Sequence, residues 1–254
     1  KPGRALLEGT DVSSALGMAT TFNAIIPQAA FDPNSKKRPA RAKPLPVLYL
    51  LHGFSDNHTM WARRTSVERY AEQHRIAVIM PDGAHSFYSN MANGGQRYWT
   101  FVSEELPFIV KSMFPVSDKR QDTFVAGLSM GGYGALKLAL SHPDRYAAAA
   151  SFSGAVDLPL WMEKDGGGNG PWIEWGNIFG SIKELRKNGN DLFQLAPKAA
   201  KAKQKPRIFL SCGTRDWLYQ DNLRFRGVLG KLGFKVDYAE ADAAHDWGFW
   251  DSMI

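Results

Sequence analysis

The 254-residue chain contains a single cysteine, Cys212. One cysteine excludes an intrachain disulfide and any metal site built from several thiolates. The six histidines are scattered, and none is paired at i and i+4 with a carboxylate between them, so we expect no metal. Apolar runs fall short of the ~18 to 20 residues that span a bilayer, so no membrane-spanning segment is expected.

Little in the sequence marks a cellular compartment. The lone cysteine and the lack of a visible signal peptide favour a cytoplasmic location. The chain starts at Lys1 and not at Met, which keeps a secreted protein with a removed leader as the alternative.

Basic residues are in excess, with a formal net charge of +6. Five of them lie between Lys36 and Lys43, in the stretch "SKKRPARAKP". Such a cluster can bind nucleic acid or a membrane surface. Aromatic residues that would stack on bases do not interleave the charges, and prolines flank them, so a solvated loop is favoured. We therefore expect no nucleic-acid partner.

Short apolar runs alternate with amphipathic segments along the chain, which predicts an α/β fold with a mostly parallel sheet. A further strand, "GMATTFNAIIP" from Gly17, alternates in polarity and is predicted at a sheet edge. We expect one domain over residues 1–254. The runs predicted as strands, apolar on both faces, are 46–53, 76–83, 122–129, 147–154, 207–214 and 234–241. The segments predicted as helices are 66–74, 103–114, 131–142 and 220–233.

The alternation of apolar runs and amphipathic segments stops over residues 157–206, which we interpret as a cap-like or lid-like insertion. Its centre, "KDGGGNGPWIEWGNIFG", is rich in glycine and tryptophan. No Lys-Ser or Lys-Thr pair follows the glycines, so a phosphate-binding P-loop is not supported. The insertion is either a surface segment or a pocket wall formed by Trp161, Trp172 and Trp175.

The stretch "GLSMGGYG" at 127–134 contains the pattern G-x-S-x-G around Ser129. A strand-like run precedes it and a helix-like run follows, which is the order of a nucleophile elbow. The flanking glycines permit a sharp turn, and the helix N-terminus favours developing negative charge. The alternative is a glycine-rich turn that lets a helix pack on the sheet. The pattern G-x-G-x-x-G of dinucleotide-binding loops does not fit.

A serine nucleophile needs a base, and two histidines follow Ser129 in the chain. His142 ends the helix that starts at the elbow, some 16 Å away at ~1.5 Å per residue, so it is interpreted as a helix-end residue. His245 lies in a loop after the last predicted strand and is predicted to be the base.

The acid is expected after a strand that lies between the nucleophile and the base in sequence. Asp216 follows such a strand and is our prediction for the carboxylate that orients the histidine. Asp221, at the start of the next helix, is the rival. Asp242 and Asp246 lie too close to His245 in sequence to be first choices.

The tetrahedral intermediate of acyl transfer also needs hydrogen-bond donors for its oxyanion. The N–H of Met130, directly after the nucleophile, is predicted as one donor. The N–H of Phe54 is predicted as the other, because "LYLLHGFSDN" places a strand and a tight turn at Gly53 before it. We interpret His52 as a residue that holds this loop in shape.

Aromatic and histidine side chains near the predicted loops are candidates for the substrate pocket. His85 and Tyr88, with Phe87, lie in "DGAHSFYSNM" after a strand end, on the same sheet edge as the elbow. Trp61 and Trp247 are further candidates. The alternative for each of them is ordinary packing, because tryptophan is usually well buried.

Together, "VLYLLHGFSDNHTMW", "MPDGAHSFYSNM", "GLSMGGYGALKLAL", "FSGAVDL", "SCGTRDWLYQDN" and "HDWGFW" resemble the esterase-D-type branch of the α/β-hydrolases. The chain is most similar to tributyrin-esterase-like carboxylesterases of the putative esterase family. The resemblance implies an α/β-hydrolase fold and a cofactor-free serine carboxylesterase that hydrolyses small-molecule, short-chain acyl esters. It also implies Ser129, His245 and Asp216 as the triad, with the N–H groups of Phe54 and Met130 as oxyanion donors.

The same superfamily leaves alternatives open. It includes S-formylglutathione hydrolases, feruloyl and acetylxylan esterases, and acyltransferases with the same triad. The insertion at 164–180 departs from its compact members. A non-catalytic binding module is a distant alternative, since such proteins usually lack a triad residue. A homo-oligomer is left open.

Overall fold

The computed structural model describes residues 3–28, 43–166 and 173–254. The strands are β1 (Arg4–Ser13), β2 (Met18–Pro27), β3 (Val47–Leu51), β4 (Ala77–Pro81), β5 (Thr123–Leu128), β6 (Ala148–Phe152), β7 (Arg207–Gly213) and β8 (Val236–Ala241). The helices are α1 (Met60–Arg64), α2 (Val67–His74), α3 (Tyr98–Thr100), α4 (Leu106–Met113), α5 (Met130–Ser141), α6 (Leu158–Lys164), α7 (Trp175–Phe179), α8 (Ile182–Lys187), α9 (Leu192–Ala199), α10 (Tyr219–Lys231) and α11 (Trp247–Met253). A π-helical turn (Phe101–Glu105) precedes α4, and a 3₁₀ turn (Arg120–Asp122) precedes β5.

The described strands form one sheet in the order β1-β2-β4-β3-β5-β6-β7-β8. The pairings from β4 through β8 are parallel, whereas β1 pairs with β2 and β2 with β4 antiparallel. Because β3 and β5 are adjacent and parallel, the loops after both strands meet at one edge of the sheet. The predicted α/β architecture and all six apolar strands are confirmed.

The edge-strand prediction for residues 17–27 is wrong. These residues do form a strand, β2, but it lies between β1 and β4. The edge is β1, which the sequence analysis missed. Most residues of β1 are exposed or half-buried and no apolar run marks them, so hydrophobic periodicity gave no signal. At the other edge, β8 is half-buried to exposed, and not covered on both faces as its apolar run predicted.

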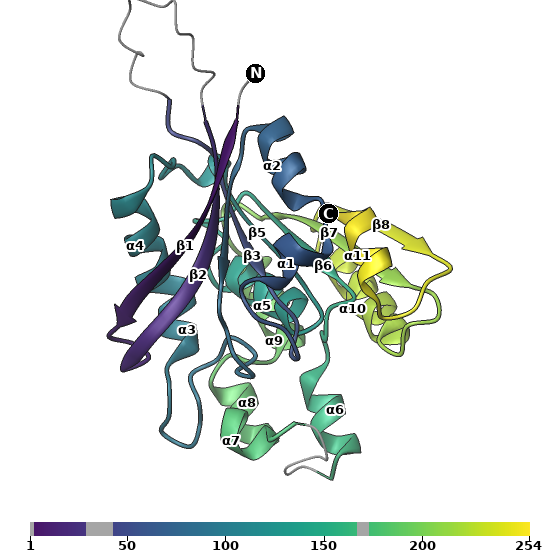
Figure 1. The fold of residues 1–254 in the computed structure, drawn as a ribbon. Coiled ribbons are helices and arrows are strands. Elements are labelled where there is room, and N and C mark those ends of the chain that lie inside the picture. Colours follow the sequence, from purple (N-terminus) through teal and green to yellow (C-terminus); the bar gives the residue numbers. More distant parts are fainter. Residues whose placement is uncertain (1–2, 29–42, 167–172) are drawn as a thin grey trace, which may run out of the picture.

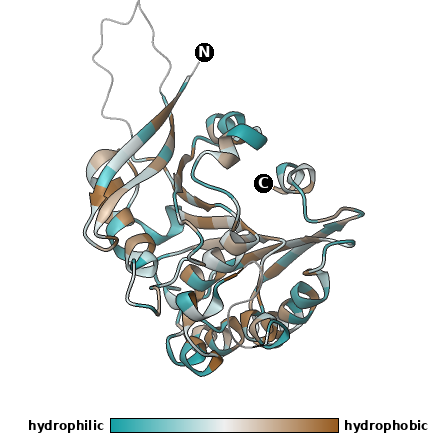
Figure 2. Ribbon diagram, turned by 60° about the horizontal axis from the view of Figure 1, so that its bottom comes forward, coloured by the Kyte–Doolittle hydropathy of each residue, from teal (hydrophilic) through white to brown (hydrophobic). Residues whose placement is uncertain are grey.

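Helices cover both faces of the sheet (Figure 1). One hydrophobic core joins the sheet to α4, α5, α9 and α10, and a second, smaller core joins its other face to α1, α2 and α11. Figure 2 shows hydrophobic residues along the central strands between these two layers. The long central helix α5 packs on β5 and β6, which fixes the position of its N-terminus relative to the sheet.

Between β6 and β7 the described chain forms α6, α7, α8 and α9. Helix α9 packs against α5. Helix α8 contacts both α6 and α7, and the three lie together at the bottom of Figure 1. Hydrophobic burial holds α7 in this place, since its residues Trp175, Ile178 and Phe179 are almost completely buried.

Two features of the sequence analysis fall outside the described residues. Four of the five clustered basic residues lie within 29–42, and Trp172 lies within 167–172. In the described part of the chain, no helix combines the length and the apolar character that crossing a membrane requires.

Candidate active site

Ser129 stands between the last residue of β5 and the first residue of α5. Its backbone has φ 52° and ψ −117°, a left-handed conformation that costs a non-glycine residue of order 1–3 kcal/mol. The turn is tight enough that a Cβ on Gly127 would collide with the backbone of Gly131. A Cβ on Gly131 would collide with the carbonyl of Leu51 in β3. The glycines therefore permit the strained turn that exposes the Ser129 hydroxyl.

Ser129, Asp216 and His245 come together in the folded chain. His245 follows Ser129 by 116 residues and Asp216 by 29 residues in the sequence. His245 Nε2 lies 3.0 Å from Ser129 Oγ, and His245 Nδ1 lies 2.7 Å from Asp216 Oδ2. An ionised carboxylate can only accept hydrogen bonds, so Nδ1 carries the proton and donates it to Asp216. The lone pair of Nε2 then faces the Ser129 hydroxyl, which donates to it.

The Asp216 carboxylate is held in its ionised form. Burial by itself would raise the pKa of this carboxyl group. The hydrogen bond and charge of His245, with the Leu218 N–H that donates to Oδ1 at 2.9 Å, outweigh burial and lower the pKa below its ordinary value. Because its side chain is fully buried, Asp216 can hold the imidazole without competition from water.

The rival candidates have other partners. Asp221 accepts a hydrogen bond from Trp161 Nε1 at 2.8 Å and forms an ion pair with Arg224. His142 lies at the end of α5, where its ring stacks on Trp99. Asp242 pairs with Arg215, and Asp246 caps the N-terminus of α11.

The predicted oxyanion donors border the nucleophile. Met130 is the first residue of α5, so its N–H belongs to the group without an intrahelical acceptor. A Cβ on Gly53 would lie 3.7 Å from Ser129 Cβ, which places the loop after β3 beside the elbow. Among the described residues, the Phe54 N–H has no acceptor. Both N–H groups are thus available to an oxygen bound at Ser129.

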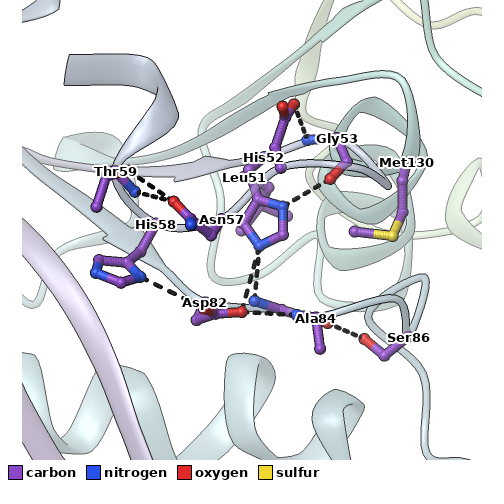
Figure 3. Close-up of polar contacts among 12 residues, drawn as sticks. Leu51, His52, Gly53, Asn57, His58, Thr59, Asp82, Ala84, Ser86 and Met130 are labelled. Atoms are coloured by element: carbon purple, nitrogen blue, oxygen red, sulfur yellow. Dashed lines mark hydrogen bonds and ion pairs between the residues drawn. The ribbon is translucent and has the colours of Figure 1, made fainter. Parts of the chain in front are cut away.

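His52 connects this loop to the loop after β4, as Figure 3 shows. The N–H of Gly83 donates to His52 Nε2 at 2.8 Å, so Nδ1 carries the proton and donates to the Gly53 carbonyl at 2.7 Å. The ring is 1% exposed. Both ring nitrogens are therefore used to hold backbone in place beside Phe54.

Ser129, His245, Phe54 and Met130 line one cavity of about 610 Å³. Its walls are mainly aromatic. On the side of the 157–206 insertion the wall includes Trp161, Ile173 and Trp175, joined by Phe87 from the loop after β4. On the side of His245 it includes Trp217, Trp247 and Trp250. The insertion thus supplies a wall of the cavity, as one of its two interpretations predicted.

Of the four predicted pocket residues, Trp247 lines this cavity and three do not. Trp61 is fully buried behind it, with Nε1 donating to the Leu51 carbonyl. Tyr88 is fully buried too, and its hydroxyl donates to the His52 carbonyl. His85 stacks on Phe54 at 4.4 Å between ring centroids and lines a neighbouring cavity of about 310 Å³.

Sequence reasoning missed Trp217 and Trp250, whose rings flank the imidazole of His245. Trp217 is next to Asp216 in "TRDWLY", so proximity to the predicted acid was an available signal. Trp250 follows His245 by five residues, on the first turn of α11, and periodicity alone could not tell it from a core residue. Its Nε1 donates to Ser153 Oγ at 3.2 Å.

Metal ligands are not grouped in the described part of the chain. No set of three or more histidine, cysteine, aspartate or glutamate side chains there is close enough to hold a metal ion.

The chain is similar to proteins of known family. The model of the family described as "Putative esterase" matches residues 13–253. An acetyl esterase of Caldicellulosiruptor saccharolyticus is 30% identical over 254 residues, covering 98% of this chain and 95% of that protein.

Two solved structures from Staphylococcus aureus are each 35% identical to this chain. The substrate-bound structure of FphF, a fluorophosphonate-binding serine hydrolase, has a TM-score of 0.87 and covers 99% of this chain and 95% of its own. The apoenzyme of FrmB, an S-formylglutathione hydrolase, has a TM-score of 0.84 and covers 98% and 95%. The sheet and its two helix layers are thus the α/β-hydrolase fold that the sequence predicted.

Proposed function

We propose that this chain, which belongs to the putative esterase family and is a carboxylic ester hydrolase, is a serine carboxylesterase for short-chain acyl esters. Ser129 would be its nucleophile, His245 its general base and Asp216 the residue that orients the base. The observation that carries this assignment is the continuous hydrogen-bonded chain from Ser129 Oγ through His245 to Asp216, with links of 3.0 and 2.7 Å.

The reaction proceeds in two halves. Ser129 Oγ attacks the ester carbonyl while His245 Nε2 accepts its proton, and the N–H groups of Phe54 and Met130 stabilise the oxyanion. His245 then gives the proton to the departing alcohol oxygen, which leaves an acyl group on Ser129. A water molecule, deprotonated by His245, attacks the acyl group and releases the carboxylic acid. Asp216 stays ionised and stabilises the imidazolium in both halves.

The cavity supports a preference for small acyl groups. The leaving oxygen must reach His245 Nε2, so the alcohol part of the ester lies on the His245 side of Ser129. The acyl part then points away from His245, toward the remaining walls, which include Phe87, Trp161 and Trp175. Trp175 is 1% exposed and Phe87 2% exposed, and their rings lie 5.4 Å apart, so this wall is well packed and limits chain length.

Turnover of p-nitrophenyl acetate, butyrate, octanoate and ferulate tests the proposal. We expect the acetyl and butyryl esters to have the highest kcat/KM. Ser129→Ala should abolish turnover of all four while leaving the fold unchanged by circular dichroism. A Ser129→Ala variant with undiminished turnover would contradict the mechanism.

Thioester hydrolysis is a second candidate, because FrmB is named as an S-formylglutathione hydrolase and covers nearly the whole chain. The same triad would serve. Comparing kcat/KM for S-formylglutathione with that for p-nitrophenyl acetate separates the two candidates, and the carboxylesterase proposal expects the oxyester to be preferred.

A further inference from the structure

The geometry points to a cation-binding subsite on the His245 side of the cavity, formed by the Asp56 carboxylate and the indoles of Trp217, Trp247 and Trp250. The inference rests on the proposed function and names its substrate class: acyl esters whose alcohol part carries an ammonium group, quaternary or primary. It therefore concerns which leaving group the cavity selects, and not whether Ser129 reacts.

The charges that line the cavity have one sign. Two carboxylates, Asp56 and Asp165, belong to its walls, and no lysine or arginine is among the described residues that line it. At the described walls a cationic leaving group would therefore meet carboxylates and no fixed cation, whereas an anionic one would be repelled.

Neither carboxylate forms an ion pair with a described residue. Asp165 accepts a hydrogen bond from Trp175 Nε1 at 2.7 Å. Asp56 accepts one from the Gly53 N–H at 3.2 Å, and no cationic side chain of the described residues lies within ion-pair distance of it. Burial raises the pKa of this carboxyl group, while His52, Arg64 and His245 act on it only through longer-range charge. An ammonium ion bound beside Asp56 would supply the missing counter-charge.

Indole rings gather on the same side. Around His245, the ring centroid of Trp217 lies 4.1 Å from the imidazole and that of Trp250 lies 4.9 Å from it. Trp247 lies 5.3 Å from Trp250. Tryptophan faces attract cations more strongly than other aromatic faces do, and such rings bind quaternary ammonium groups. The cavity that receives the alcohol is thus lined by these indoles and by the Asp56 carboxylate.

The wall that the insertion supplies carries both signs of charge. Lys164 Nζ lies 4.6 Å from the ring centroid of Trp161, so a cation already occupies an aromatic face there. Asp165 also belongs to this wall, where Trp175 Nε1 donates to it. We therefore assign the positive charge to the alcohol part of the ester, beside the indoles of Trp217, Trp247 and Trp250, over which no described lysine or arginine lies.

A cation near His245 is subject to electrostatic repulsion during the reaction, and Asp56 offsets this repulsion. The imidazolium that forms in the transition state repels a positive leaving group. Asp56 and His245 line the same cavity, and the Asp56 carboxylate attracts both cations. Removing the charge of Asp56 should therefore slow a cationic ester more than a neutral ester of the same shape.

The test compares acetylcholine with 3,3-dimethylbutyl acetate, its uncharged isostere, in wild type, Asp56→Asn and the matched charge control Asp144→Asn. Asp144 lines a different cavity, beside the starts of β3 and β5. We expect the wild type to favour acetylcholine by about tenfold in kcat/KM. Asp56→Asn, which keeps the acceptor for the Gly53 N–H, should lower that ratio about threefold to tenfold, and Asp144→Asn should leave it unchanged.

A wild-type ratio near one overturns the inference without any variant. Equal losses for both esters in Asp56→Asn also overturn it, because they would show that Asp56 only supports the loop of Phe54. If the proposed function itself fails, p-nitrophenyl acetate is not turned over either, and that result is distinct from an enzyme that hydrolyses it without preferring the cation.

Discussion

The indole of Trp217 lies against the imidazole of His245, with ring centroids 4.1 Å apart and ring planes tilted by 35°. Trp217 is 63% exposed, unusual for so large an apolar side chain, and Trp250 meets the same imidazole edge-on from another side. Because an aromatic face stabilises a neighbouring cation, this contact favours the imidazolium that the proposed mechanism forms in its transition state.

Replacing Trp217 by leucine should therefore lower kcat/KM for p-nitrophenyl acetate about twofold to fivefold, the equivalent of ~0.5 to 1 kcal/mol. Trp217→Phe, which keeps an aromatic face, should fall between leucine and wild type. An equal loss of kcat/KM in Trp217→Phe and Trp217→Leu would show that the indole only covers the cavity.

Asp216→Asn should reduce kcat by roughly 10²- to 10⁴-fold, because an amide in this place no longer fixes the Nδ1–H tautomer or stabilises the imidazolium. Thermal unfolding followed by circular dichroism checks that the variant is folded. Asp221→Asn is the comparison, since Asp221 pairs with Trp161 and Arg224 and does not touch His245. If Asp221→Asn were the more damaging change, the acid would be misassigned.

Phe87→Leu should lengthen the acyl chains that the cavity accepts. The smaller side chain opens the wall opposite His245, so the ratio of octanoate to acetate turnover should rise about threefold or more. Phe179 is the matched control, because it contacts Phe87 and is equally buried but does not line the cavity. A similar rise in Phe179→Leu would indicate general loosening and not a wall at Phe87.

Asp82 should contribute to stability against acid. Burial tends to raise the pKa of its carboxyl group. The imidazoles of His52 and His58, whose nearest ring nitrogens lie 3.7 and 3.4 Å from its oxygens, and the Ala84 N–H that donates to Oδ1 outweigh burial and lower the pKa from 3.8 to about 2. A lowered pKa favours the native state above about pH 4, and this stabilisation disappears as the pH falls toward 2. The shift corresponds to about 2 kcal/mol.

Urea unfolding of wild type and Asp82→Asn at pH 5 and pH 2 measures this contribution. The variant should lose about 2 kcal/mol less than wild type between the two pH values. Asp242→Asn, which removes a carboxylate that is 83% exposed, should behave like wild type. An equal loss in wild type and Asp82→Asn would contradict the assignment.

The residues proposed for catalysis could be predicted from sequence because each is tied to a local pattern. Ser129 lies in G-x-S-x-G between a strand and a helix, and its positive φ is the strain that such an elbow stores. Asp216 and His245 each follow a strand, in the chain order that the elbow predicts. The strands β3 to β7 were found for a related reason, since burial on both faces leaves continuous apolar runs, whereas β8 lies at the sheet edge.

The cavity walls could not be predicted in the same way. Trp61 and Trp247 are neighbours, with ring centroids 5.3 Å apart. Trp61 is fully buried in the second core, whereas Trp247 lines the cavity. The loop after β4 shows the same limit, because Phe87 faces the cavity while its neighbour Tyr88 faces the core. Both have positive φ, and local sequence does not specify which side chain a strained loop turns toward the site.

Fluorophosphonate labelling, followed by intact mass and peptide mapping, tests the central claim most directly. The account predicts one covalent adduct, on Ser129, with p-nitrophenyl acetate turnover lost in proportion to labelling and no adduct in Ser129→Ala. An unlabelled wild type, or labelling and turnover that persist in Ser129→Ala, would contradict it.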